Sequence, residues 1–271
     1  MNLVSQQPWY KEWFNSPFYH KLYFERDEQE AQSFIHKLIT HLSPAHGSRM
    51  LDVGCGRGRH SKILAALGFD VTGIDLAPDS IEYAKQFESS RLQFFLHDMR
   101  LPFWINYFDY AFNFFTSFGY FRTRREHDDA IRTIGGSLRP GGILMIDFLN
   151  VHYAEAHLVP NEIKKIGTTT FDIHRWHDDT HFYKKINIID PGLSQPISFT
   201  EIVAKLSLGD FTDMLSFQSL QVQEVFGDYQ LSKYDISKTP RLIIVARKKG
   251  IDSGDKEKRL YSDGRTTDAL T

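Results

Sequence analysis

Apolar and polar positions follow two alternating patterns along the chain, and their order predicts the fold. Between residues 49 and 150, most of the short apolar runs are followed by a stretch whose apolar positions repeat with the period of a helix face. Apolar strands that alternate with helices are typical of a parallel sheet covered on both faces, so we expect an α/β core. The predicted strands are residues 49–54, 70–75, 92–98, 108–117 and 141–150, and the predicted helices are residues 60–68, 77–87 and 125–138.

The pattern changes after Asn150, where consecutive segments alternate apolar and polar residues one by one. Turn residues separate these segments at Asp178-Asp179 and at Pro191-Gly192. We therefore expect a small antiparallel sheet, inserted over residues 165–208 and lying over the core, with residues 209–249 completing the core. The inserted strands are predicted at residues 169–178, 180–190 and 198–207, followed by a helix at 209–217 and strands at 220–229 and 241–249.

The N-terminal segment, residues 1–42, is predicted to be helical. Residues 27–42 place their apolar side chains on one helical face, and Ser43-Pro44 ends that pattern. Residues 1–25 are dense in aromatic side chains, which fits either a helix pair packed on the core or a lid over a pocket. We treat residues 1–42 as a lid segment and residues 43–150 as the main part of the core.

Composition and net charge limit the cellular compartment and the kinds of partner that we expect. The formal net charge is −2, which argues against a basic surface for nucleic acid or an acidic membrane. The single cysteine, Cys55, rules out an intrachain disulfide, and the first residues lack a secretory pattern, so we expect a cytoplasmic protein with a small-molecule partner. No stretch is apolar enough to span a membrane. Residues 250–271 are polar and charged, which predicts a disordered tail.

The first predicted strand ends in a glycine-rich turn, residues 54–58, with the sequence GCGRG. Open α/β sheets bind ligands at the carboxyl ends of their strands, and glycines let the backbone approach a ligand closely. A dinucleotide site has the spacing G-x-G-x-x-G, whereas the third glycine here comes one residue early. Asp52 also places negative charge where a pyrophosphate would lie, so a ligand with an ammonium group is favoured over NAD.

Two further acids close the next two predicted strands. Asp75 ends the second strand, where a carboxylate can accept both hydroxyls of a ribose. Asp98 ends the third strand beside Met99, and this pair can flank an adenine. Because the carboxyl ends of parallel strands meet at one edge of a sheet, acids closing three strands predict one nucleoside site rather than three separate loop caps.

The glycine turn and these acids, with LRPGG at residues 138–142 and the closing RLIIVARK at residues 241–248, resemble the class I S-adenosylmethionine-dependent methyltransferases. The resemblance covers residues 49–150. It implies a Rossmann-like, seven-stranded, mostly parallel sheet with a final antiparallel strand, and S-adenosylmethionine as the cofactor.

The resemblance also implies a set of cofactor contacts by position. It implies that Asp52 and the glycine turn contact the methionyl part and that Asp75 binds the ribose. The end of the fourth strand would lie near the methyl group. The implied contacts are Asp52, Gly54, Cys55, Gly56, Gly58, Asp75, Leu76, Asp98, Met99, Asn113 and Phe114.

The side chains that act on the acceptor are predicted from their loops rather than from a motif. Methyl transfer from a sulfonium is an in-line displacement, which depends on alignment and exclusion of water more than on a strong catalytic group. A hydroxyl or ammonium acceptor must still release a proton. The candidates lie after the fourth and fifth strands and in the lid segment, and are Tyr120, Asn150, His152, Tyr19 and His20, with Tyr10 and Tyr23 beside them.

Several acceptor classes remain open from the sequence. Aromatic density favours a small, partly apolar or cationic molecule that is methylated on nitrogen or oxygen. The fourth strand lacks an Asn/Asp-Pro-Pro-aromatic motif, which weighs against amide nitrogens and DNA adenine. The alternatives are a C-methyltransferase of a quinone-like ring and a protein that binds S-adenosylmethionine without turnover. An NAD-dependent oxidoreductase is disfavoured by the glycine spacing.

Two clusters of side chains are interpreted as surface features. His174, His177 and His181 fit an exposed hairpin better than a metal site, so we expect no metal. The basic run over residues 122–132 offers an anion patch, but the acids interspersed in it favour a solvated helix face.

Overall fold

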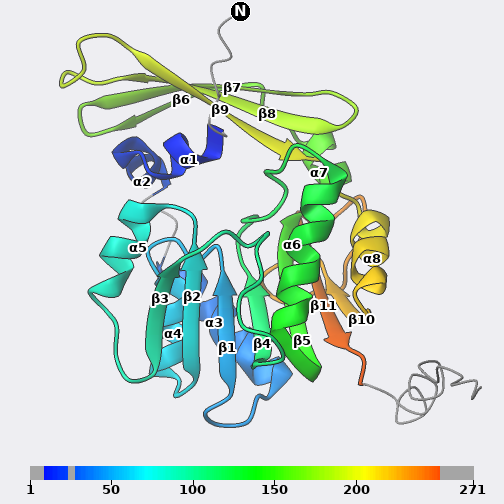
Figure 1. Ribbon diagram of the computed structural model, residues 1–271. Coiled ribbons are helices and arrows are strands. Elements are labelled where there is room, and N and C mark those ends of the chain that lie inside the picture. Colours follow the sequence, from blue (N-terminus) through cyan, green and yellow to red (C-terminus); the bar gives the residue numbers. More distant parts are fainter. Residues whose placement is uncertain (1–8, 24–27, 251–271) are drawn as a thin grey trace, which may run out of the picture.

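The core of the protein is a seven-stranded sheet. The computed structural model describes residues 9–23 and 28–250, so the predicted tail lies almost wholly outside the described residues. The strands are β1 (Arg49–Val53), β2 (Asp70–Asp75), β3 (Leu92–Leu96), β4 (Phe108–Asn113), β5 (Leu138–Leu149), β10 (Leu220–Phe226) and β11 (Arg241–Lys248), in the order β10-β11-β5-β4-β1-β2-β3 (Figure 1).

One strand of this sheet runs against the others. β11 pairs antiparallel with β5 and with β10, whereas the remaining neighbours pair in parallel. The predicted Rossmann-like, mostly parallel sheet with a final antiparallel strand is therefore confirmed. That last strand does not form the edge, because β10 pairs with its outer side.

Helices cover both faces of the sheet, as the alternation of strands and helices predicts. Met50 of β1 packs with α3 (Glu28–Leu42), α4 (Arg59–Ala66) and α5 (Pro78–Lys85), while its neighbour Leu51 packs on the opposite face with α6 (Arg124–Ser137) and α8 (Leu208–Phe217). Successive side chains of a strand point to opposite faces, so each strand contributes to two apolar layers. This sandwich fixes the strand ends, on which the site is built.

A second sheet of four strands follows β5 and the short helix α7 (Val151–Ala156). Its strands are β6 (Asn161–Ile166), β7 (Thr169–His177), β8 (His181–Ile189) and β9 (Ile197–Ala204), paired antiparallel in chain order. The sequence predicts the last three strands but not β6. That strand forms an edge and is largely exposed, so its sequence, NEIKKI, lacks the alternation that a half-buried strand shows.

The N-terminal helices α1 (Trp9–Phe14) and α2 (Pro17–Tyr23) lie between the second sheet and the strand ends of the core (Figure 1). Trp13 and Leu22 are buried in an apolar cluster with Phe171 and Ile186 of the second sheet. The helix α3, by contrast, packs on the core sheet. We use "lid" below for α1, α2 and the second sheet.

Polar contacts fasten α1 and α2 to the second sheet. Glu201 of β9 accepts hydrogen bonds from the Trp13 indole at 2.7 Å and from the Tyr23 hydroxyl at 2.6 Å. Lys184 of β8 donates to the same hydroxyl and lies 3.6 Å from the Glu201 carboxylate. The helices are therefore tied to the lid sheet by side chains. Within the described ranges, no helix combines the length and apolar character needed to cross a bilayer.

Candidate active site

A cavity of about 780 Å³ lies between the carboxyl ends of the core strands and the helices α1 and α2. This volume is in the range of small-ligand sites. The core lines it with Gly54, Cys55, Gly56, Asp75, Leu76, Asp98, Met99 and Phe114, and the lid side with Tyr10, Phe14, Tyr19, His20 and Tyr23, joined by Tyr120 and Phe121 from the loop after β4. The cavity thus brings most of the predicted site residues together.

The glycine turn after β1 is fixed by the neighbouring strand. The amides of Gly54 and Cys55 both donate to the Ile74 carbonyl, at 2.8 and 3.0 Å. Gly54, Gly56 and Gly58 all have positive φ, which glycine adopts without penalty. A side chain at Gly56 would meet no atom within 4 Å, so this glycine leaves open space at the cavity wall.

The third glycine of the turn serves packing rather than the ligand. Gly58 does not line the cavity, and a Cβ there would lie 2.5 Å from the Phe94 ring. The expectation that Gly58 lets the cofactor pass is corrected accordingly, because its lack of a side chain makes room for a core aromatic ring.

Asp75 lies in the cavity wall, at the end of β2. Its carboxylate oxygens accept backbone N–H bonds from Gly56 and Ala77, both at 2.8 Å. Burial raises the pKa of this carboxyl, although these backbone hydrogen bonds oppose the rise. A carboxylate has about four acceptor positions, so two remain for hydroxyl donors. The structure therefore places Asp75 where the sequence predicts a ribose-binding acid.

Asp52 occupies a different place from the one that the sequence predicts. It is 1% exposed and lies under the glycine turn, where its carboxylate accepts a 2.5 Å hydrogen bond from the Ser61 hydroxyl of α4. Burial raises its pKa to about 7. Asp52 does not line the cavity, so the prediction that it contacts a methionyl ammonium directly is corrected. Its carboxyl lies behind the cavity wall.

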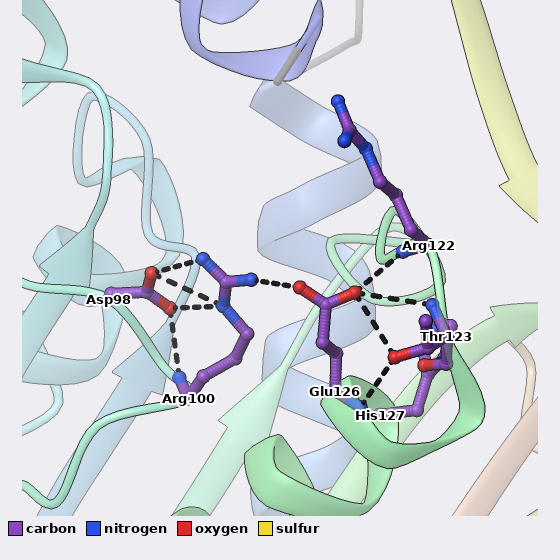
Figure 2. A network of polar contacts seen from close by, with 6 residues as sticks. All are labelled: Asp98, Arg100, Arg122, Thr123, Glu126 and His127. Carbon is purple, nitrogen blue, oxygen red and sulfur yellow. Dashed lines mark hydrogen bonds and ion pairs between the residues drawn. The ribbon is translucent and has the colours of Figure 1, made fainter. Parts of the chain in front are cut away.

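Asp98 lines the cavity but already has a cationic partner (Figure 2). Arg100 donates to it from its backbone amide at 2.9 Å and from Nη2 at 2.7 Å, and Nη1 of the same guanidinium reaches Glu126 of α6 at 2.5 Å. Burial disfavours the charge of Asp98, but the Arg100 hydrogen bonds outweigh it and lower its pKa. Much of the acceptor capacity expected to meet an adenine amine is thus occupied by Arg100.

This ion-pair chain connects two walls of the cavity. Glu126 also accepts the backbone N–H groups of Arg122 and Thr123, and it forms a capping box with Thr123 at the start of α6 (Figure 2). Arg100 further lies 5.0 Å from the centre of the Phe121 ring. The loop after β4 is therefore anchored to the acid at the end of β3.

The end of β4 contributes one wall residue and one supporting residue. Phe114 lines the cavity and stacks on His60 with ring centres 4.5 Å apart. Asn113 is fully buried and donates from its side chain to the Val53 carbonyl at 2.8 Å. Asn113 does not line the cavity, so the prediction that it lies beneath the cofactor is corrected. Its side chain links β4 to β1 instead.

The lid side of the cavity is built from aromatic rings in edge-to-face contact. Tyr120 meets Phe14 with ring centres 5.1 Å apart, and Phe14 meets Tyr19 at 5.0 Å. Tyr19 in turn meets Tyr23 in a tilted arrangement, with ring centres 4.9 Å apart. These rings present apolar faces and phenol groups, and no carboxylate from the lid lines the described cavity.

His20 is the one titratable nitrogen that the lid brings to the cavity among the described residues. Burial, aided by the Arg57 guanidinium, lowers its pKa to about 4. Its imidazole is therefore neutral at pH 7 and retains a lone pair. Its Nε2 is buried without a hydrogen-bond partner in the described part of the chain.

Two predicted catalytic candidates lie outside the cavity. Asn150 is fully buried, and its side chain donates to the carbonyls of Asp235, Ile236 and Thr239 at 2.8–3.2 Å. His152 is exposed on α7. Neither residue lines the cavity, so both predictions are corrected: the Asn150 side chain turns to the 235–239 loop, and His152 is exposed on α7.

The surface clusters have local partners. His174 bonds to Asn161, His177 to Lys205 and His181 to Thr180. Across the described residues, no group of three or more His, Cys, Asp or Glu side chains is arranged to hold a metal ion. In the basic run, Arg124 pairs with Asp128 and Asp210, and Arg132 with Asp129.

The sequence analysis does not select several basic residues that line the cavity. Arg57, Arg59 and Lys62 lie in its wall, and each places its charge over an aromatic ring: Arg57 over Tyr83, Arg59 over Phe115 and Lys62 over Phe87. Arg57 inside the glycine turn and Arg59 directly after it are visible in the sequence and could have indicated this basic wall. Cys55 also lines the cavity, and burial raises the pKa of its thiol, which disfavours a nucleophilic thiolate.

Comparison with known proteins decides the class of the core. Residues 50–142 match the family model described as a methyltransferase domain. Over these residues the chain is similar to methyltransferase domains. The resemblance to S-adenosylmethionine-dependent methyltransferases is thereby confirmed. The match begins in β1 and ends in β5, so it contains the glycine turn and all three strand-end acids.

Individual relatives extend this result. A putative methyltransferase, YqeM of Bacillus subtilis, is 35% identical over 102 residues, which cover 36% of this chain and 41% of the relative. A dTDP-3-amino-3,4,6-trideoxy-alpha-D-glucopyranose N,N-dimethyltransferase of Streptomyces venezuelae is 25% identical over 174 residues, covering 62% of this chain and 72% of the relative. The chain spans about half the length of the curated relatives that it matches first, 41% and 54%.

A solved structure shows the same fold over most of the chain. The S-adenosylmethionine-dependent methyltransferase of Clostridium acetobutylicum superimposes with a TM-score of 0.72 at 16% identity, covering 86% of this chain and 97% of that one. The shared architecture therefore extends beyond the methyltransferase domain.

Proposed function

We propose that the protein transfers a methyl group from S-adenosylmethionine to a nitrogen or oxygen of a small molecule. The observation that carries this proposal is one continuous cavity that joins a glycine turn and a ribose-type acid on the core to an aromatic wall on the lid. The glycine turn and the ribose-type acid lie within the residues that match a methyltransferase domain. The aromatic wall of the lid supplies a place for an acceptor beside the cofactor.

The residues present fit S-adenosylmethionine. Gly56 leaves a gap in the wall that a Cβ would fill, beside an acid with two free acceptor positions at Asp75. Asp75, Gly54 and Gly56 would hold the ribose and methionyl parts. Leu76 and Met99 would flank the adenine, and Asp98 retains only limited capacity for its amine.

Bound S-adenosylmethionine supplies an electrophilic methyl group on a sulfonium. The chain contributes alignment and a dry environment, which are the main requirements of an in-line displacement. Phe114 is packed against His60 and forms a rigid part of the wall. Tyr19, Phe14 and Tyr120 line the cavity on the lid side, where their rings would shield a bound acceptor from water.

An acceptor hydroxyl or ammonium must lose a proton, and His20 is the lid group best suited to receive it. His20 lines the cavity beside the phenol groups, and its imidazole is neutral at physiological pH. The burial that lowers its pKa also makes it a weaker base, so we expect proton transfer to depend on the charge that the bound acceptor develops. Aromatic faces also attract cationic groups, so the wall accommodates an amine. The Streptomyces venezuelae relative, named for N,N-dimethylation of an amino sugar, supports nitrogen as the acceptor atom.

The test is a transfer assay with methyl-labelled S-adenosylmethionine against a panel of amino sugars, other amines, phenols, quinone-like rings and bulk tRNA. We expect label on nitrogen or oxygen of a small amine or hydroxyl compound, reduced in a His20→Gln variant. Label on a ring carbon would favour the C-methyltransferase alternative. Cofactor binding without transfer to any acceptor would favour a binding protein, and label on tRNA would contradict the small-molecule assignment.

A further inference from the structure

The loop after β4 has an unusual backbone conformation at the cavity wall. Phe115 and Thr116 are consecutive non-glycine residues with φ of 54° and 57°. This left-handed region is disfavoured for side chains other than glycine, and most strongly for β-branched residues such as threonine. Such strain persists only where the surroundings enforce it, and it concentrates at functional sites.

Three hydrogen bonds enforce this conformation, and all come from two residues. The Phe115 N–H donates to the Asp147 carboxylate at 2.8 Å, and the Thr116 N–H donates to the Asp147 carbonyl at 2.9 Å. Nη2 of Arg241 donates to the Thr116 hydroxyl at 2.9 Å. Both backbone amides of the strained pair are thus held by one residue of β5.

Asp147 and Arg241 form a buried ion pair between β5 and β11. Asp147 is fully buried, and one carboxylate oxygen accepts from Arg241 Nε at 2.8 Å and Nη2 at 2.6 Å. The other oxygen accepts from the Tyr229 hydroxyl at 3.1 Å. Buried ion pairs commonly give little net stability compared with apolar replacements, so stability alone does not account for this one.

The conformation that this pair enforces shapes the cavity. Phe115 lines it and stacks on His60 with ring centres 5.1 Å apart. Ser117, two residues after Phe115, lines it as well and donates from its hydroxyl to the Gly54 carbonyl at 3.3 Å. Its Cβ would lie 2.6 Å from any side chain at Gly54, so loop and glycine turn fit closely.

We propose that Asp147 and Arg241 are positioning residues that hold the strained loop 114–117 against the glycine turn, and so preorganise the cavity for its nucleoside cofactor. They do not themselves line the cavity. Their effect passes through Phe115, Thr116 and Ser117. This inference rests on the proposed function, because it assumes that the preorganised cavity binds S-adenosylmethionine.

The test uses S-adenosylhomocysteine titrated calorimetrically into the full chain, with thermal unfolding measured on the same samples. Arg241→Gln releases Thr116, and we expect the dissociation constant to rise by about 10-fold as the loop relaxes toward an unstrained conformation. Adding Thr116→Gly should restore affinity to within about 3-fold of the wild type, since glycine adopts positive φ freely. A merely structural role would not produce this rescue.

A stability control separates positioning from general weakening. Leu215→Ala in α8 removes a fully buried side chain on the opposite face of the sheet from α3–α5, and that side chain does not line the cavity. It should lower the melting temperature while leaving affinity within about 2-fold, because a distant core cavity costs stability without moving the loop. Equal loss of affinity in Leu215→Ala and Arg241→Gln would overturn the proposal.

A milder variant keeps the test decisive if Arg241→Gln does not fold. Thr116→Val removes only the hydroxyl that Arg241 holds and leaves a β-branched residue at positive φ. We expect about a 3- to 10-fold loss of affinity with a small change in melting temperature. Wild-type affinity in this variant would overturn the positioning role. Failure of the wild type to bind S-adenosylhomocysteine would instead overturn the proposed function.

Discussion

The core wall and the lid wall of the cavity consist of different chemical groups. On the core side, the wall contains glycines, backbone amides and the acids Asp75 and Asp98. The strand β2 fixes the glycine turn, as the bonds from Gly54 to Ile74 and from Gly56 to Asp75 show. On the lid side, short helices present aromatic rings that pack edge to face, and Glu201 fastens them to the second sheet through Trp13 and Tyr23.

This difference separates the cofactor from the acceptor. Backbone geometry at strand ends depends on the whole sheet and changes little with individual side chains. Aromatic rings on short helices can be exchanged without disturbing the sheet, so we expect the lid to select the acceptor and the core to bind the cofactor.

The largest effect is expected from Asp52, under the core wall. Its folded pKa of about 7 lies above the unfolded value of 3.8, so the folded state keeps a proton that the unfolded state has lost between those pH values. The free energy of unfolding therefore falls as pH rises from about 4 to 7, by roughly 3–4 kcal/mol in total. Asp52→Asn should remove this slope in denaturation curves at pH 5, 6, 7 and 8.

The lid is expected to show the opposite pH dependence. His20 has a folded pKa of about 4, below the unfolded 6.5, so stability that depends on its neutral form is lost as pH falls from 6.5 toward 4. His20→Gln should flatten the acid side of the curve and leave the slope from Asp52 unchanged. A common change in both variants would show that the two walls do not titrate independently.

A smaller effect is expected at Asp75. Asp75→Ala removes the acceptor for the ribose hydroxyls and for the Gly56 amide. A hydrogen bond to a charged group is worth roughly 1.5–3 kcal/mol, so the dissociation constant for S-adenosylhomocysteine should rise about 10- to 100-fold. Calorimetry measures it directly, with Asp75→Asn as the control that keeps one acceptor oxygen. Unchanged affinity in the alanine variant would remove Asp75 from the site.

The smallest effect on the cofactor is expected from the lid clamp. Glu201→Gln weakens the bonds to Trp13, Tyr23 and Lys184. Affinity for S-adenosylhomocysteine should stay within about 2-fold, while amide hydrogen exchange in α1 and α2 becomes faster because the helices are held less firmly. A large loss of cofactor affinity would contradict the division between the walls.

The sequence predicts the core better than its additions. Strands β1, β2, β4 and β11 are largely buried, and helix patterns separate most of the parallel strands, so the succession of elements and the parallel core follow from periodicity. The antiparallel direction of β11 is implied only by the family resemblance. The exposed edge strand β6 and the six-residue helix α7 are missed because neither carries a sustained pattern. Their existence depends on pairing with β7 and on the course of the chain after β5.

Prediction from the sequence is limited in the same way for single residues of the site. Asp75 and Asp98 are found because strand ends converge at one edge, a property of the topology. Asp52 and Asn150 are also polar residues at or near strand ends, yet their side chains turn inward to Ser61 and to the 235–239 loop. Sequence position gives the strand end but not the direction of the side chain, which packing decides.

The most direct test of the central claim is a pair of calorimetric titrations of the wild-type chain, one with S-adenosylhomocysteine and one with NAD. The glycine spacing, Asp75 and the methyltransferase domain predict saturable binding of S-adenosylhomocysteine with one site per chain and no binding of NAD. Saturable binding of NAD without binding of S-adenosylhomocysteine would contradict the account.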